Sequence, residues 1–247
     1  NPDVDPWIPV QDSQIIIPTQ YVLPNVEREG VVINLAELRL YQFHGTENNI
    51  SSVSTYPVSV GKDDEWKTPL SFTRITSKTA KPNWYPPASI RKEHEDNNDP
   101  LPEVVPPGPD NPLGDYKIGL ALSGYLIHGT NVPEGIGMRV THGCIRLHPT
   151  GIEKLFKSVE VNTPVTIINQ PYKVGWRDNK LYVETHSEIE EQEKASSRNL
   201  TEFVKLVVAQ TKEKERENYK ILWERGYQEA KEKRGVPFLM SHRDGET

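Results

Sequence analysis

The sequence predicts a mainly β protein, a mixed β-sandwich or barrel with a long proline-rich lid and a C-terminal helical extension. Three observations carry this prediction. Between Gly30 and about Ile118, short runs rich in β-branched residues alternate with turn residues at regular spacing, which is typical of a sandwich or barrel. Nine of the 21 prolines fall within residues 82–112. From Leu200 onward, apolar residues recur at the spacing of a helix.

The first part of the chain divides into a leading segment and a β-rich domain. Residues 1–29 are punctuated by prolines and contain one β-rich run at 14–17, so we expect a linker or an edge strand. The domain is expected to span residues 30–170. Its predicted strands are short runs rich in β-branched residues, and they cover residues 31–35, 38–43, 52–60 and 71–77.

Residues 82–112 interrupt the strand pattern with prolines and an acidic, polar run at 92–99. Loops of this length without regular structure are usually functional lids or disordered segments. The aromatic pair Trp84 and Tyr85 next to Pro86-Pro87 favours an ordered lid over the substrate cleft. The alternative is a structural excursion that is packed by its own prolines.

After the lid, the pattern predicts a short helix over residues 149–159, a closing strand over 164–168 and another strand over 180–184. Residues 171–247 are therefore expected to form a strand followed by a helical extension. Asn199 and Glu202 resemble a capping box at the start of a helix, and Gly235 and Pro237 supply a stop.

The helical extension has two apolar clusters, one from Leu200 to Val207 and one from Tyr219 to Ala230. The charged run 212–217 between them is either a solvated helix face or a break between two helices. We expect the helices to pack on the β domain by one apolar face. The alternative is an element that docks a partner or shapes the cleft.

Bulk composition narrows the class of protein. The 247 residues are 35% hydrophobic and 26% charged, which suits a soluble globular protein of one large domain or one domain plus an appendage. No apolar run approaches eighteen residues, so no membrane span is expected. The net charge of −6 argues against nucleic acid as a partner. Because the chain begins at Asn1, we expect a processed product from which any signal peptide is missing.

The single cysteine, Cys144, lies in the run Thr-His-Gly-Cys-Ile-Arg-Leu at 141–147, sixteen residues after His128. A lone thiol cannot form an internal disulfide, and its neighbours favour a nucleophile. A cysteine nucleophile needs a base, a group that orients the base, and donors for the oxyanion formed during attack on a carbonyl.

The sequence offers a candidate for each requirement. His128 ends the apolar run 125–127 and is the expected base. Gly129 follows, where the chain can turn and leave a backbone carbonyl to hold the imidazole. Gly143 lets the backbone bend and present N–H groups toward a reacting carbonyl. His142 is the rival base, and we expect it to support the site structurally.

Other interpretations of these residues remain open. Cys144 alone would suit a buried small side chain or an oxidation-sensing thiol, and with His142 and His148 it would suit zinc. Structural zinc sites usually need four ligands, and no paired-ligand spacing is present, so no metal is expected. Arg146 and Arg139 either hold a substrate carboxylate through the planar guanidinium or brace the loop. His44 and His148 are expected on the surface.

The stretch 128–147 resembles the signature of the L,D-transpeptidases: His-Gly-Thr, a spacer, then Ser/Thr-His-Gly-Cys-Ile-Arg-Leu. The resemblance covers roughly residues 1–186 and is closest to the Gram-negative periplasmic branch. Thr141 stands where serine is commoner, and it retains the hydroxyl. The other matching segments are residues 32–41, 56–62, 66–69, 82–87 and 108–114.

The resemblance implies a two-step acyl transfer on peptidoglycan in the periplasm, without metal or organic cofactor. Cys144 would attack the third residue of a tetrapeptide stem, releasing D-alanine, with His128 as base and acid and the Gly129 carbonyl as its orienter. Gly143 would supply oxyanion donors with Thr141 and His142 in support. The expected substrate-binding residues are Arg146, Arg139, Trp84 and Tyr85.

The acceptor amine implied by the resemblance belongs to a second stem peptide or to a lysine of an outer-membrane lipoprotein. Acylation by carbapenem-type β-lactams is implied as well. Two alternatives remain open: an L,D-carboxypeptidase or endopeptidase that uses the same site, and a non-catalytic peptidoglycan-binding scaffold.

Overall fold

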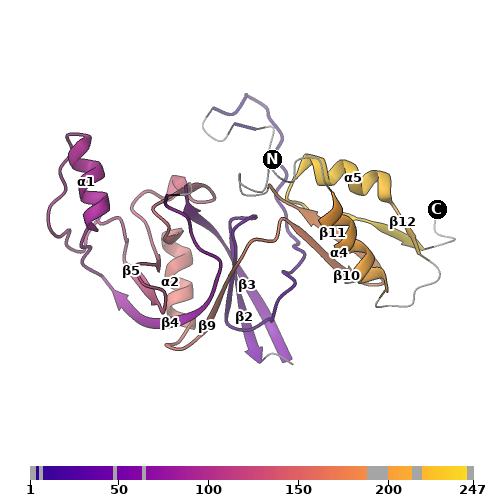
Figure 1. Cartoon of the computed structure of the whole chain (residues 1–247), viewed down its shortest axis with the longest axis horizontal. Helices are drawn as coiled ribbons and strands as arrows, with labels where there is room; N and C mark the ends of the chain where they lie inside the picture. Colours follow the sequence, from indigo (N-terminus) through magenta and orange to yellow (C-terminus); the bar gives the residue numbers. More distant parts are fainter. Residues whose placement is uncertain are drawn as a thin grey trace. The chain divides into compact units, whose positions relative to one another are not determined.

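The computed structural model describes residues 4–5, 8–46, 49–62, 65–187, 200–212 and 219–243. The chain divides into two compact units (Figure 1). One unit is Glu27–Ile168. The other combines Asn1–Val26 with Asn169–Thr247. The mainly β class predicted from the sequence is confirmed. No described helix is long and apolar enough to cross a membrane.

The first unit is built on one nine-stranded sheet in the order β2-β1-β9-β4-β5-β6-β8-β3-β7. An additional pairing of β2 with β3 closes eight of these strands into a barrel, and β7 pairs with β3 outside the ring. The strands are β1 (Val31–Asn34), β2 (Arg39–Thr46), β3 (Asn49–Gly61), β4 (Ser71–Ala80), β5 (Tyr116–Leu120), β6 (Leu126–His128), β7 (Arg139–Thr141), β8 (Ile145–Leu147) and β9 (Pro164–Ile168).

In several strands the barrel core comes from alternate residues, because successive side chains of a strand point to opposite faces. In β1 all four residues are buried. Burying one such aliphatic side chain contributes about 1.5–3 kcal/mol. Helix α2 (Pro149–Ser158) covers part of the sheet with Ile152 and Leu155. The fully buried strand residues include Ile33, Leu40, Val58, Ile75, Ile118, Ile127, Ile145 and Leu147.

Helix α2 confirms the helix predicted over residues 149–159. It begins after His148, whose exposed side chain accepts a hydrogen bond from the Thr150 N–H and so caps the first turn. Pro149 occupies the first turn, where the missing N–H costs nothing. A short 3₁₀ turn, Pro133–Gly135, lies between β6 and β7.

Residues 82–112 differ from the expected irregular loop, because they contain helix α1 (Ala88–Asp96). The helix buries none of its residues, so it lacks the apolar periodicity by which a helix is found in a sequence. The segment is held in place at its base. Trp84 and Val105 exchange backbone hydrogen bonds of 2.9 Å, and the buried Asn111 amide donates to the Pro82 carbonyl at 2.8 Å.

The second unit contains strands as well as the expected helices. Strands β10 (Tyr172–Arg177), β11 (Lys180–Thr185) and β13 (Phe238–Leu239) form one sheet, and β12 (Tyr219–Ile221) pairs with β14 (Ser241–Arg243). Helices α4 (Thr201–Lys212) and α5 (Trp223–Glu232) complete the unit. Its core residues are Tyr172, Leu181, Val183, Phe203, Val207, Ala230, Phe238 and Met240.

Several expectations for this unit need correction. The second apolar cluster does not begin a helix at Tyr219, because 219–221 is strand β12 and the helix starts at Trp223. The helices are expected to pack on the β domain, but helix α4 packs on β10 within its own unit, where Phe203 and Val207 are buried. Residues 14–17 form no strand. The expected cap residue Asn199 and most of the charged run 212–217 lie outside the described residues.

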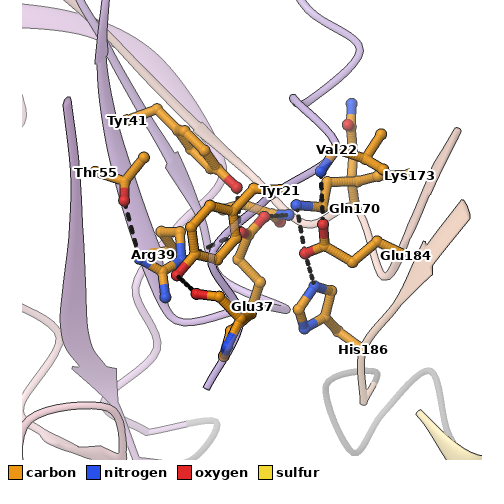
Figure 2. Close-up of polar contacts among 12 residues, drawn as sticks. Tyr21, Val22, Glu37, Arg39, Tyr41, Thr55, Gln170, Lys173, Glu184 and His186 are labelled. Atoms are coloured by element: carbon orange, nitrogen blue, oxygen red, sulfur yellow. Dashed lines mark hydrogen bonds and ion pairs between the residues drawn. The ribbon is translucent and has the colours of Figure 1, made fainter. Parts of the chain in front are cut away.

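A buried ion pair joins β10 and β11 in the second unit. Lys173 Nζ lies 2.8 Å from Glu184 Oε1, and both side chains have no exposed surface. Glu184 also contacts His186 Nε2 at 2.7 Å and accepts the Val22 N–H at 2.7 Å (Figure 2). Burial alone would raise the pKa of Glu184, but His186 and Lys173 hold it below its ordinary value.

We expect Lys173→Met to lower the free energy of unfolding by about 3–5 kcal/mol, because it removes the buried cation from the buried carboxylate of Glu184, which then keeps only His186 and the Val22 N–H as partners. Chemical denaturation followed by circular dichroism measures the change. Arg177→Met is the matched control, since Arg177 pairs with Asp178 on the surface and such pairs contribute about 0–1 kcal/mol. Equal, small effects of the two substitutions would contradict this account of the buried pair.

Candidate active site

The barrel brings the two halves of the motif together through the parallel pair β6 and β8. Ile127 lies opposite Ile145, and His128 lies opposite Arg146. Ile127 and Ile145 point into the core, where they are fully buried. Side chains alternate along a strand, so His128 and Arg146 project from the other face. Cys144 directly precedes β8 and is two residues from Arg146, which places it on that same face.

His128 is held in one orientation by its own backbone neighbour. Its Nδ1 lies 2.7 Å from the carbonyl oxygen of Gly129. A carbonyl only accepts hydrogen bonds, so Nδ1 carries the proton and Nε2 is left as the basic nitrogen. Burial, reinforced by the positive charge of Arg146, lowers the pKa of His128 to about 4. The imidazole is therefore neutral at neutral pH and able to accept a proton.

Cys144 is the one cysteine of the chain, and its thiol is free and half-buried. Sγ lies 3.7 Å from the Gly124 carbonyl oxygen. Burial raises the pKa of the thiol, and a hydrogen bond from the Leu126 backbone and the charge of Arg146 only partly offset this rise. The resting site thus pairs a neutral thiol with a neutral imidazole.

The backbone around Cys144 is fixed by two threonine hydroxyls. Thr141 Oγ1 donates to the Cys144 carbonyl at 2.7 Å, and Thr68 Oγ1 donates to the Gly143 carbonyl at 2.7 Å. Gly143 has φ of +96°, and a Cβ there would lie 2.9 Å from a ring carbon of Tyr125. Within the described part of the chain, the N–H groups of Gly143 and Cys144 donate to no protein acceptor.

The two arginines of the motif region have different surroundings. Arg139, on β7, donates from Nη2 to the Leu35 carbonyl at 2.8 Å, which matches the bracing interpretation. Arg146 is half-buried, and burial lowers the pKa of its guanidinium. Among the described residues, no acceptor lies within hydrogen-bond distance of its buried Nε. The Nε of Arg146 therefore takes part in no bracing contact of the kind that Arg139 makes.

His142 links the motif to helix α1. Its Nε2 lies 2.6 Å from Glu93 Oε2, and the edge of its ring meets Trp66 with ring centroids 4.6 Å apart. Glu93 also pairs with Lys62 Nζ at 3.3 Å. Hydrogen bonds from His142 and Lys62 lower the pKa of Glu93. Segment 82–112 is thus attached to the loop that carries Cys144.

The aromatic residues expected to bind substrate belong to segment 82–112 itself. Trp84 forms the backbone bridge with Val105, and the side chain of Tyr85 is 66% exposed. The residues that do surround the motif, and that sequence reasoning did not single out, are Thr68, Glu93, Trp66 and Tyr125. Their contacts span 18 to 76 residues along the chain, and only the family-like run 66–69 gave any signal.

A thiol, an oriented neutral imidazole and two unpartnered N–H groups on one barrel edge are the groups that cysteine-dependent acyl transfer uses. Comparison with known proteins defines the family. The model of the L,D-transpeptidase catalytic domain, YkuD, matches residues 28–167. Because this match spans more than half of the chain, the protein belongs to the L,D-transpeptidase family.

Individual relatives agree with this membership. The Escherichia coli protein described as "Probable L,D-transpeptidase YcfS" is 46% identical over 195 residues, which cover 77% of this chain and 60% of that protein. "Probable L,D-transpeptidase ErfK/SrfK" of Salmonella typhimurium is 40% identical over 82% of this chain and 62% of that protein. The chain thus spans about three fifths of the length of these curated relatives.

Among solved structures, an L,D-transpeptidase from Mycobacterium tuberculosis is similar with a TM-score of 0.41 and 17% identity, over 57% of each chain. An L,D-transpeptidase in complex with imipenem is similar with a TM-score of 0.40 and 19% identity, over 57% of this chain and 59% of that one.

Proposed function

We propose that this protein is a periplasmic, cysteine-dependent L,D-transpeptidase that acts on peptidoglycan stem peptides. The observation that supports it most is the oriented, neutral His128 on the same sheet face as Cys144. A base with a free Nε2 next to a protonated thiol is the starting state that general-base activation of a nucleophile requires.

In the first step, Cys144 Sγ attacks the carbonyl carbon of the third residue of a tetrapeptide stem, and His128 Nε2 accepts the thiol proton. The carbonyl oxygen becomes an oxyanion that the N–H groups of Gly143 and Cys144 bind. When the tetrahedral intermediate collapses, the C–N bond breaks, and His128 returns the proton to the leaving amine of D-alanine. A thioester remains on Cys144.

In the second step, an amine attacks the thioester carbonyl, His128 accepts the amine proton, and the sulfur leaves and takes the proton back. The new amide bond replaces the thioester, so no external energy source or cofactor is required. The acceptor is the side-chain amine of another stem peptide or of a lysine in an outer-membrane lipoprotein. Arg146 would hold a carboxylate of the stem, and the absence of a partner for its Nε among the described residues supports this role.

We also propose that residues 82–112 form a lid over the substrate cleft. Glu93 supports this role, because it attaches α1 to His142, two residues before the nucleophile. Trp84 and Tyr85 would then meet substrate as part of the lid, and the exposed ring of Tyr85 would be covered on binding. The domain boundaries near residues 30 and 170 belong to the same proposal.

We expect Glu93→Gln to raise KM for a tetrapeptide substrate by about three- to tenfold with a smaller change in kcat. The amide keeps the shape but removes the charge that pairs with His142 and Lys62, and charge-assisted hydrogen bonds are about twice as strong as neutral ones. Steady-state kinetics of D-alanine release measure the effect. Glu153→Gln is the control, since Glu153 pairs with Lys157 on the exposed side of α2. Unchanged kinetics in Glu93→Gln would contradict the lid attachment.

The test of the function itself is incubation with disaccharide tetrapeptide, followed by intact mass spectrometry of the protein and analysis of the products. A thioester adduct, release of D-alanine and a dimer joined through third residues are expected for transpeptidation. Release of D-alanine with only tripeptide would replace the proposal with the carboxypeptidase alternative. Absence of both adduct and product in the folded protein would favour the non-catalytic scaffold.

Addition of a lysine-containing lipoprotein peptide to the same reaction separates the two acceptors. A conjugate of tripeptide and lysine side chain would identify the lipoprotein as acceptor, and exclusive formation of the stem dimer would identify the second stem.

A further inference from the structure

One threonine outside the motif controls the backbone on which the nucleophile sits. Thr68 lies between β3 and β4, and only 3% of its surface is exposed. Its hydroxyl donates to the carbonyl of Gly143 at 2.7 Å and accepts the N–H of Gly61 at 3.0 Å. A single buried hydroxyl therefore connects the end of β3 to the peptide unit directly before Cys144.

The geometry of a peptide unit gives this contact a consequence. In a trans peptide the carbonyl and the N–H of the same unit point in opposite directions, and the described residues contain no cis peptide bond. Thr68 holds the Gly143 carbonyl, so the N–H of Cys144 must point away from Thr68. That N–H is one of the two beside the nucleophile that donate to no acceptor among the described residues.

We infer that Thr68 is a positioning residue for the oxyanion site: its hydroxyl fixes the Gly143–Cys144 peptide unit so that the Cys144 N–H is aimed at the developing oxyanion. This inference rests on the proposed acyl transfer. It assigns to the protein a residue that stands 76 positions before the nucleophile in the sequence and lies outside the signature motif.

An anchor of this kind is needed because the loop carries a glycine. Gly143 adopts φ of +96°, and a residue without Cβ can rotate its neighbouring peptide units more freely than any other. Thr141 fixes the carbonyl of Cys144 on the other side of the nucleophile. The two hydroxyls together clamp the peptide units on both sides of Cys144, and preorganised donors avoid the cost of reorientation during the reaction.

The alternative is a purely structural role, in which Thr68 only closes the turn between β3 and β4 by accepting the Gly61 N–H. The two roles differ in the kind of reaction that they affect. Acylation by a carbonyl compound needs the oxyanion site. Alkylation of the same thiol by iodoacetamide is a displacement at carbon that forms no oxyanion, so it reports only on the thiol and its base.

The experiment compares Thr68→Val, Thr68→Ser and wild type in both reactions, with imipenem as the acylating probe and intact mass as the readout. Valine has nearly the shape of threonine and lacks the hydroxyl. We expect Thr68→Val to slow acylation by about 10²-fold, the loss typical of a misaligned oxyanion donor, and to leave alkylation within about twofold of wild type. Thr68→Ser retains the hydroxyl and should restore most of the acylation rate.

Thr73→Val is the matched control. Thr73 is also a buried threonine, and no partner for its Oγ1 lies within the described residues, so its substitution should leave both rates unchanged. Melting temperatures establish that each variant is folded at the assay temperature.

Equal slowing of both reactions in Thr68→Val would overturn the inference in favour of the purely structural role, and an unchanged acylation rate would overturn it outright. If wild type is alkylated but forms no adduct with either imipenem or tetrapeptide, the proposed function fails first. If wild type and Thr68→Val are acylated at the same rate, the role of Thr68 is contradicted and the proposed function still stands.

Discussion

Cys144→Ala is expected to eliminate the acyl adduct and to lower the rate of D-alanine release by at least about 10⁴-fold. The reason is that the proposed reaction divides one amide exchange into two steps around a thioester, and alanine offers no atom to form it. Removal of a nucleophile usually leaves only the residual catalysis that comes from binding and oxyanion donors. Intact mass and D-alanine release measure the two quantities on the same samples.

The alanine variant should fold normally, which makes the result interpretable. Cys144 is half-buried, and the described polar contacts of its thiol are the 3.7 Å approach of Sγ to the Gly124 carbonyl and a hydrogen bond from the Leu126 backbone. A thiol is only a weak hydrogen-bond donor and acceptor. Loss of one sulfur atom from such a position costs little stability, so the melting temperature should change by no more than a few degrees. Substantial D-alanine release by a folded alanine variant would exclude cysteine catalysis on this substrate.

Much of the barrel follows from residue patterns that are local. Strand β9 occupies the predicted residues 164–168, and the strands near residues 31, 39 and 71 begin within a residue of the expected positions. Alternating apolar and polar residues encode one buried face directly. By contrast, α1 buries no residue, so its helical state leaves no hydrophobic pattern in the sequence.

The contacts of the site also differ in how far apart their residues lie in the sequence. The contact of His128 with Gly129 joins adjacent residues, and a sequence motif can therefore suggest it. The contacts of Glu93 with His142 and of Thr68 with Gly143 span 49 and 75 residues. They depend on how the barrel places β3, segment 82–112 and the motif loop, which no short-range pattern specifies. The raised pKa of the Cys144 thiol also depends on the fold, because burial is its main cause.

His128→Asn is expected to slow acylation at pH 7 by about 10²–10⁴-fold, the usual contribution of a general base. The pH dependence should change in form as well. With His128 at a pKa of about 4 and a thiol whose pKa is raised by burial, the wild-type rate should be constant from about pH 5.5 to 8. In the asparagine variant only the thiolate reacts, so its rate should rise about tenfold per pH unit over this range. Imipenem acylation measured by stopped-flow fluorescence gives both profiles, and His44→Gln, on β2, is the control.

The same shift in pKa makes an independent prediction for stability. A histidine in the unfolded chain has a pKa near 6.5, so between pH 6.5 and 4 the unfolded state binds more protons than the folded state. The free energy of unfolding should therefore fall as pH drops through this window, with His128 contributing about 3 kcal/mol of the loss, because one pKa unit corresponds to 1.36 kcal/mol. His128→Asn should flatten this part of the stability profile. If the variant retained the full decrease, or if the wild-type acylation rate fell with a midpoint near pH 6.5, His128 would titrate like an exposed histidine. Burial would then not be what keeps the imidazole neutral, and the lowered pKa of His128 would be contradicted.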